Sequence, residues 1–264
     1  MKLSISNIAW DNKDNNKIYN LMVENDYSGL EIAPTKIFPN NPYDLLDEAE
    51  AWAKELKNKY KFSISSIQSI WYGRTEKIFE SFDERQILIN YTKKAIDFAS
   101  VIECKNLVFG CPKNRNIDSD EDYKIAIEFF KELGDYAYSK NTCLGMEANP
   151  KIYNTNFINN THEAIDLIKK VDSNGFKLNL DIGTIIENNE DIDELVGNVH
   201  LINHVHISEP YLEQIQPRDL HKKILTILKN ENYDKFISIE MKQQENLQDV
   251  KQVMQYLKLI SGVQ

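Results

Sequence analysis

The sequence lacks the long apolar runs, basic runs and signal segment that mark membrane, nucleic-acid-binding and secreted proteins. No apolar run approaches the roughly 20 residues that a membrane-spanning helix needs, and the N-terminal stretch MKLSISNIAW contains no signal-peptide core. Lysine and arginine form no cluster, and a net charge of −10 opposes binding to a nucleic-acid backbone. We therefore expect a soluble, cytoplasmic protein without membrane or nucleic-acid partners.

Cysteine is scarce as well. The chain has three cysteines, Cys104, Cys111 and Cys143, and no two of them show CxxC spacing. Three thiols cannot all pair within one chain, which indicates a reducing compartment. This agrees with the expected cytoplasmic location.

Glycine-rich phosphate-binding motifs and flexible linkers are missing too. The first strand-to-helix turn contains no GxGxxG, and no P-loop occurs elsewhere. These absences disfavour a doubly wound open sheet, which is the main alternative architecture for alternating strands and helices. No Pro-, Gly- or Ser-rich linker divides the chain, so we expect one domain over residues 1–264.

Short segments of strand-like composition recur along the whole chain. They are expected at residues 2–6, 29–33, 62–68, 106–110, 143–148, 177–181, 202–207 and 236–240. Amphipathic stretches separate them, as in 41–60, where the apolar residues follow the spacing of one buried helix face. That face consists of Leu45, Leu46, Ala49, Ala53 and Leu56.

Two further helices are predicted at 83–102, with Asp83 as the N-cap, and at 246–260. Strands that alternate with helices favour a parallel sheet, because parallel neighbours need a crossover between them. Eight such units in a chain of this length predict an α/β fold, a single closed (β/α)8 TIM barrel.

Polar residues alternate with apolar ones inside the predicted strands. In 177–181 the leucines share one face, while Asn179 and Asp181 share the other. The segments at 29–33 and 236–240 alternate in the same way, with Glu31 and Glu240 on the polar face. In a barrel the polar face points toward the axis. Because buried polar groups need partners, this interior favours a ligand site.

The last inward positions of the fifth to eighth strands are Glu147, Asp181, His206 and Glu240. Active sites of such barrels lie at these strand ends, so the four side chains are predicted to converge at one layer. Three carboxylates at one point repel each other unless a cation neutralises them, and we therefore predict one bound divalent metal ion.

The predicted ligand atoms are three carboxylate oxygens and one imidazole nitrogen. This set suits Mn²⁺, Mg²⁺ or Co²⁺ better than Zn²⁺, since no thiolate lies at these strand ends. His204 shares the inward face with His206 but lies two residues deeper. It is interpreted as a buried, hydrogen-bonded residue that supports the site.

Several strand-end motifs resemble one family. The chain contains GLEIAPTKIF, LVFGCPKNR, GMEANP, NLDIGT, HVHISEP and SIEMK, in this order. These motifs resemble the xylose-isomerase-like TIM barrel superfamily, in particular its sugar phosphate isomerase/epimerase group.

The resemblance implies that Glu147, Asp181, His206 and Glu240 bind one divalent metal and that Glu147 and Glu240 are also the catalytic acid/base pair. One glutamate would remove a proton next to a substrate carbonyl, and a metal-stabilised enediolate would follow. The implied substrate is a small sugar, a sugar phosphate or a related anionic sugar. Members of the superfamily are often dimers or tetramers, so a homo-oligomer is possible.

Three positions depart from the pattern of the ketose 3-epimerases in this group. Thr184 stands where they carry a histidine, Leu212 where they carry an arginine, and Tyr153 where they carry a supporting glutamate. Two alternatives stay open: a metal-dependent lyase or dehydratase on the same site, and a barrel that binds carbohydrate without turnover. The DNA-repair branch needs more strand-end histidines than this chain has.

The loops at the barrel mouth supply the predicted substrate-binding residues. Trp10 and Tyr72 either stack on a sugar or cap the core. Arg74 and Arg115 either hold a phosphate or carboxylate or are solvated loop charges. Lys242 either neutralises an enediolate or pairs with a carboxylate. The complete predicted set is Trp10, Tyr72, Arg74, Arg115, Thr184, Glu209 and Lys242.

Overall fold

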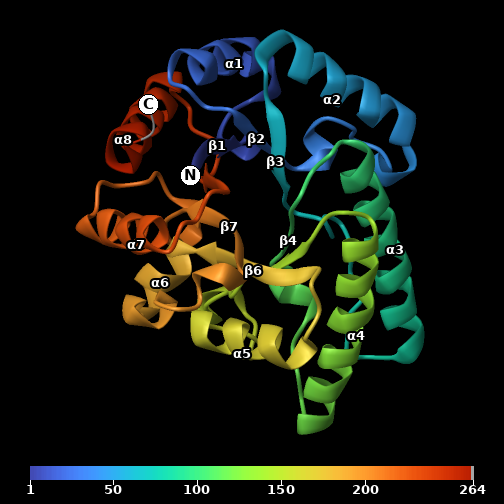
Figure 1. Cartoon of the computed structure of the whole chain (residues 1–264). Coiled ribbons are helices and arrows are strands. Elements are labelled where there is room, and N and C mark those ends of the chain that lie inside the picture. Colours follow the sequence, from blue (N-terminus) through green and yellow to red (C-terminus); the bar gives the residue numbers. More distant parts are fainter. Residues whose placement is uncertain (263–264) are drawn as a thin grey trace.

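The computed structural model describes residues 1–262, and its strands form a closed parallel barrel in the order β1 to β8 (Figure 1). The strands are β1 Lys2–Ser6, β2 Gly29–Ile32, β3 Ser63–Ile67, β4 Leu107–Phe109, β5 Leu144–Met146, β6 Phe176–Asp181, β7 Ile202–Ile207 and β8 Phe236–Ile239. Each lies within its predicted segment or starts one residue before it. The barrel closes because β1 pairs with β8, with Leu3 opposite Ile237. The open-sheet alternative is therefore wrong.

The helices surround the barrel as an outer ring (Figure 1). They are α1 Asn15–Glu24, α2 Leu46–Tyr60, α3 Phe82–Val101, α4 Asp120–Ser139, α5 Thr161–Val171, α6 Ile182–Asn188, α7 Asp219–Asn230 and α8 Leu247–Ser261. The last helix, red in Figure 1, packs between α1 and α7 and so completes the ring. The predicted (β/α)8 TIM barrel is confirmed.

Two local details differ from the sequence prediction. Ser81, not Asp83, caps α3: its backbone is extended, and its hydroxyl accepts a hydrogen bond from the Glu84 N–H at 3.1 Å. Asp83 lies inside the first turn, where its backbone is already helical. In α2 the predicted apolar face is only partly covered, since Ala49 and Leu56 are buried while Leu46 and Ala53 are half-buried. Leu45 precedes that helix.

The apolar core lies between the barrel and the ring of helices. Strand residues such as Leu3, Ile5, Ile237 and Ile239 are fully buried there. We estimate that each contributes roughly 1.5–3 kcal/mol of stabilisation by leaving water. This burial fixes the strand register, because a one-residue slip would turn every apolar side chain to the wrong face.

The barrel interior is polar, as the alternation predicts. Ser4 Oγ lies 2.6 Å from Ser65 Oγ and 3.3 Å from Ser238 Oγ, and all three side chains are buried. Higher in the barrel, Asn106 Nδ2 donates to Ser66 Oγ at 2.9 Å. Hydrogen bonding offsets the cost of burying these groups. The interior therefore forms a rigid polar floor beneath the strand ends.

The cysteines and the helices bear on two predictions, those of unpaired thiols and of no membrane-spanning segment. Cys104, Cys111 and Cys143 are all free thiols. Within residues 1–262, no helix combines the length and the apolar character needed to cross a membrane.

Candidate metal centre

Glu147, Asp181, His206 and Glu240 converge at the carboxyl ends of β5 to β8. Each offers one ligand atom, and these four atoms all lie within 4.8 Å of one another. Asp181 is the last residue of β6, and His206 lies inside β7. Glu147 and Glu240 each follow directly after the end of a strand, β5 and β8. The sequence prediction that these side chains meet is supported by this geometry.

The four residues do not share one level of the strand register. Asp181 pairs with His206, but His206 pairs with Ser238, which precedes Glu240 by two residues. The predicted single layer is therefore a stepped arrangement. Barrel strands tilt and are staggered relative to one another, so residues at different register positions reach the same height along the axis.

The two ring nitrogens of His206 have different neighbours. Nδ1 lies 2.9 Å from Glu147 Oε1 and 3.0 Å from Glu240 Oε2, so it faces the cluster. Nε2 lies 2.9 Å from Glu31 Oε2 on the opposite side of the ring. Burial lowers the pKa of His206, but the surrounding carboxylates of Glu240 and Glu31 outweigh it and raise that pKa well above its usual value.

The carboxylates carry charge that the protein alone stabilises poorly. Burial, helped by the charge of Glu147, raises the pKa of Asp181 to about 6. Burial also raises the pKa of Glu240 to about 7. Crowded, desolvated carboxylates of this kind suit a divalent cation, which removes the repulsion. Three oxygens and Nδ1 of His206 provide the donors, and no cysteine belongs to this cluster.

Neighbouring groups hold the candidate ligands in place. Asp181 caps α6: its Oδ2 accepts from the Thr184 N–H at 2.9 Å, and Ser208 Oγ donates to Oδ1. Asn179 Nδ2 donates to Glu147 Oε1 at 2.8 Å. A Cβ atom at Gly110 would lie 2.8 Å from Glu147 Oε2, so a side chain at this position would displace this carboxylate.

Glu31 is a part of the site that the sequence did not single out. Its side chain is fully buried, and Oε2 lies 2.9 Å from both His204 Nε2 and His206 Nε2. Burial raises the pKa of Glu31, but the two histidines outweigh this and hold it well below its usual value. The inward-facing pattern of 29–33 placed Glu31 in the barrel. No local signal linked it to histidines more than 170 residues away.

His204 is buried as predicted, but its Nε2 forms no hydrogen bond within residues 1–262, and its supporting role stays a prediction. It is almost fully buried, and burial lowers its pKa. Its Nε2 lies within ion-pair distance of Glu31 but without hydrogen-bond geometry. His204, Glu31 and His206 form a second group whose ligand atoms lie close together. Since Glu31 already contacts Nε2 of His206, we interpret this group as the support of the first cluster.

A cavity of about 240 Å³ opens above the candidate metal centre. Glu147, Asp181 and Glu240 form its floor. The residues around them are Gln68, Ser69, Val108, Gly110, Cys111, Pro112, Asn149, Tyr153 and Leu212. Two of the three positions that depart from the epimerase pattern, Tyr153 and Leu212, therefore line this cavity.

None of the predicted substrate-binding side chains lines that cavity. Trp10 is fully buried, with Nε1 donating to Asn15 Oδ1 at 2.7 Å, so it caps the core. Tyr72 is 71% exposed. Thr184 is buried behind Asp181, with Oγ1 2.8 Å from Oδ2 of that residue.

The predicted charged residues are engaged with other groups. Arg74 pairs with Glu76, and Lys242 with Glu213. Both oxygens of Glu209 accept from Arg218, at 2.7 and 2.6 Å. For Arg74 this corresponds to the alternative of a loop charge, and for Lys242 to the alternative of pairing with a carboxylate. The opposite charge lies two residues away for Arg74 and 29 residues away for Lys242, and sequence spacing alone does not say which neighbour a loop charge contacts.

Arg115 lies inside the protein and not at the predicted mouth position. Its guanidinium donates to Asn149 Oδ1 at 2.8 Å and to the carbonyl oxygen of Glu147 at 3.1 Å. A third bond of 3.4 Å reaches the carbonyl oxygen of Ile158. Arg115 therefore ties the loop after β5 to the loop after β4, because the loop carbonyls need a donor that backbone pairing does not supply.

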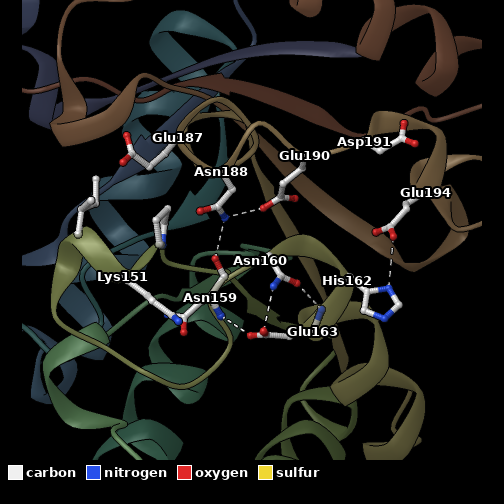
Figure 2. Close-up of a pocket in the computed structure, with 12 residues that line it drawn as sticks. Lys151, Asn159, Asn160, His162, Glu163, Glu187, Asn188, Glu190, Asp191 and Glu194 are labelled. Carbon is white, nitrogen blue, oxygen red and sulfur yellow. Dashed lines mark hydrogen bonds and ion pairs between the residues drawn. The ribbon is translucent and has the colours of Figure 1, made fainter.

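A separate hollow of about 610 Å³ lies beside the start of α5 and the end of α6 (Figure 2). Its side chains mostly bond to one another, as in Asn188 with Glu190 at 2.7 Å and Asn160 with Glu163 at 2.9 Å. His162 lies 3.5 Å from Glu194. None of the four candidate metal ligands lines it.

Three solved structures illustrate what this fold is similar to. The 3-keto-D-glucoside 4-epimerase of E. coli has a TM-score of 0.77 at 18% identity, covering 100% of both chains. The D-psicose 3-epimerase of Clostridium cellulolyticum H10 has a TM-score of 0.77 at 15% identity, covering 99% of this chain and 98% of that one. The probable 3-DHS dehydratase of Bacillus anthracis has a TM-score of 0.70 at 18% identity, covering 98% of each chain.

At these identities the likeness concerns the fold alone. No protein with a curated description matches the sequence. The sequence model of the xylose isomerase-like TIM barrel family matches residues 20–260, which is most of the chain. The eight-stranded barrel and this match together show that the chain belongs to the xylose isomerase-like TIM barrel family.

Proposed function

We propose that this protein is a divalent-metal-dependent isomerase or epimerase of a small sugar. The observation that carries the proposal is the convergence of Glu147, Asp181, His206 and Glu240 within 4.8 Å on the floor of an open cavity. A bound divalent ion would stabilise the negative charge that develops on the substrate oxygens when a neighbouring carbon loses its proton.

The residues of the chain would divide the remaining work. Asp181 and His206 are held by Thr184, Ser208 and Glu31, so they are suited to a fixed role as ligands. Glu147 and Glu240 both line the cavity and approach His206 Nδ1, at 2.9 and 3.0 Å. We assign these two glutamates as the pair that removes and returns the proton, because each presents a carboxylate to the substrate space.

The similar proteins favour the same reaction class. Two of the three structures described above are named as sugar epimerases, and their chains are covered almost completely. The third is named as a probable 3-DHS dehydratase, and this supports loss of water as the second candidate reaction. A barrel that binds carbohydrate without turnover is the remaining alternative.

Two measurements test the proposal together. The first is elemental analysis of the purified protein, in which we expect about one divalent ion per chain. The second is exchange of a substrate C–H proton with deuterated water, across a panel of ketoses. Glu147→Gln and Glu240→Gln should each slow the exchange by about 10²–10⁴-fold, which is the usual contribution of a general acid or base.

Glu121→Gln is the matched control, since Glu121 is an exposed glutamate on α4 that pairs with Lys124. It should leave both readouts unchanged. Metal content that survives Glu147→Gln combined with Asp181→Asn would contradict the shared site. Loss of water from the substrate without isomer formation would contradict the isomerase proposal and support the dehydratase alternative. Metal binding without proton exchange or water loss for any substrate would support the alternative of a barrel that binds carbohydrate without turnover.

A further inference from the structure

Within residues 1–262, no lysine or arginine lines the cavity above the candidate metal centre. Among the described residues that line it, the carboxylic side chains are Glu147, Asp181 and Glu240. The polar side chains above them are neutral amides and hydroxyls, such as Gln68, Ser69 and Asn149. The remaining wall is apolar. This charge distribution differs from a phosphate site, which needs arginine, lysine or several backbone N–H groups.

The lysine and arginine side chains of the surrounding loops contact other groups and do not enter the cavity. Arg74 and Lys242 pair with Glu76 and Glu213, and Arg218 with Glu209. Arg115 is buried against backbone carbonyls. Lys113 follows Pro112 of the cavity wall, but its side chain is exposed and does not line the cavity.

We propose that the site takes an uncharged sugar and discriminates against its phosphate ester. The proposal rests on the proposed function and specifies its substrate class. It differs from the anionic sugar that the sequence predicts, because the cations behind that prediction do not reach the cavity. A phosphate dianion on the substrate would find no arginine or lysine in the cavity wall to pair with, and a bound divalent ion would offset only part of the charge of the three carboxylates.

Neutral hydroxyl groups match what the wall offers. Tyr153 Oη accepts a hydrogen bond from the Tyr211 N–H at 2.8 Å, which leaves its own hydrogen available to a ligand. Leu212, in the short helical turn Pro210–Leu212 after β7, supplies an apolar surface for the carbon face of a sugar. Tyr153 and Leu212 therefore form a wall suited to a polyol and not to an anion.

The experiment compares ketoses with their phosphate esters on the Mn²⁺-loaded protein. The neutral probes are D-psicose, D-tagatose and D-fructose, and the charged probes are D-tagatose 6-phosphate and D-fructose 6-phosphate. The readout is kcat/KM for proton exchange with deuterated water. We expect the best neutral ketose to exceed its ester by at least about tenfold, which corresponds to about 1.4 kcal/mol.

A charge introduced at the wall gives the second arm. Leu212→Arg should raise the ratio of ester to neutral kcat/KM by about tenfold or more, while the matched control Leu212→Gln should not. Ser69→Lys, with Ser69→Gln as its control, repeats the test from the opposite loop if the first variant folds poorly. Unchanged metal content shows that each variant keeps the site.

The outcomes separate the two levels of the argument. Equal or faster exchange of the phosphate esters would overturn the uncharged substrate but keep the metal-dependent isomerase. Absence of exchange with every probe, neutral and charged, would overturn the isomerase and the inference with it. An ester ratio that does not respond to Leu212→Arg or Ser69→Lys would contradict the electrostatic reason.

Discussion

At the residue scale, the contact with Glu31 determines which ring nitrogen of His206 is free to act as a metal ligand. A carboxylate against Nε2 favours the hydrogen on that nitrogen and leaves Nδ1 for the cluster with Glu147 and Glu240. Such partners of a ligating histidine fix its tautomer and its ring orientation. Glu31 is therefore a positioning residue, although it does not line the cavity.

Removing the charge of Glu31 should weaken metal binding. We expect Glu31→Gln to raise the dissociation constant for Mn²⁺ by about 10–100-fold, because the amide holds the ring less firmly. Titration against a competing chelator measures this. Nitrogen NMR of the histidine rings in Zn²⁺-loaded protein should show a changed tautomer for His206. Ser4→Ala, another buried polar change inside the barrel, should leave affinity unaltered, and an unaltered affinity in Glu31→Gln itself would refute the role.

His221 is a second residue whose environment has a measurable consequence. It is fully buried on α7, its Nδ1 lies 3.0 Å from Tyr256 Oη, and its Nε2 has no hydrogen-bond partner among residues 1–262. Burial lowers the pKa of His221 to about 4, although the nearby Glu209 opposes this and Arg218 adds to it. The folded state therefore keeps His221 neutral where the unfolded chain already binds a proton.

The sign of the pH effect follows from this difference. Between pH 6.5 and 4 the unfolded state binds more protons at His221, so stability falls as the pH falls. From pH 7 to 4.5 we expect this residue to remove about 2 kcal/mol of the free energy of unfolding. Denaturant titrations at both values should show a smaller loss in His221→Gln. The exposed His162→Gln serves as the control, and the same loss in all three proteins would rule the explanation out.

At the scale of the elements, strand ends and helix starts determine where the candidate ligands lie. Asp181 ends β6 and at the same time caps α6 through the Thr184 N–H. A single carboxylate thus fixes the helix start and faces the cluster. Thr184, which replaces a histidine of the epimerases, contacts Asp181 and the carbonyl oxygen of Ala148 at 2.9 Å. Its position favours a role in holding Asp181.

The cap of α3 gives a test of how helix starts are encoded. Ser81→Ala should lower the free energy of unfolding by about 1 kcal/mol, because the Glu84 N–H loses its acceptor. Asp83→Ala should cost only a few tenths of a kcal/mol, since Asp83 contributes charge to the first turn without a cap bond. Chemical denaturation of both variants measures the difference. A larger loss in Asp83→Ala would favour the sequence prediction over the structure.

At the scale of the whole molecule, the barrel brings distant strand ends to one point. Glu147 and Glu240 directly follow β5 and β8, yet both approach Nδ1 of His206 on β7. Closing the sheet therefore concentrates negative charge at the strand ends, and this charge destabilises the fold. A cation that binds only the folded state should therefore stabilise the entire fold.

Metal addition should raise the melting temperature. At a free Mn²⁺ concentration of about 100 times the dissociation constant, binding adds about 2.7 kcal/mol. For a protein of this size that corresponds to a shift of roughly 5–10 °C. Calorimetry with Mn²⁺ and then with excess chelator measures it. Asp181→Asn should lose most of the shift, and an equal shift in that variant would point to ions bound elsewhere.

Local sequence patterns were enough to predict the elements and the sides on which their residues lie. Alternation with a period of two identified the strands and placed Asp181 and Glu240 on the inward face, because this pattern is local. The order of the strand-end motifs then predicted the barrel and the convergence of the four candidate ligands. The metal, the location in the cell, the single domain and the oligomer remain predictions.

Which side chains contact one another depends on the three-dimensional fold. Glu31 reaches His206 across the barrel, Arg115 turns inward to loop carbonyls, and Arg74, Glu209 and Lys242 find opposite charges. The contacts of Glu31, Arg115 and Lys242 join segments far apart in the chain and depend on strand tilt and loop paths, whereas Arg74 pairs with a glutamate only two residues away. Sequence spacing records none of these, because a charged residue near a strand end has the same local pattern whether it binds a ligand or a neighbour.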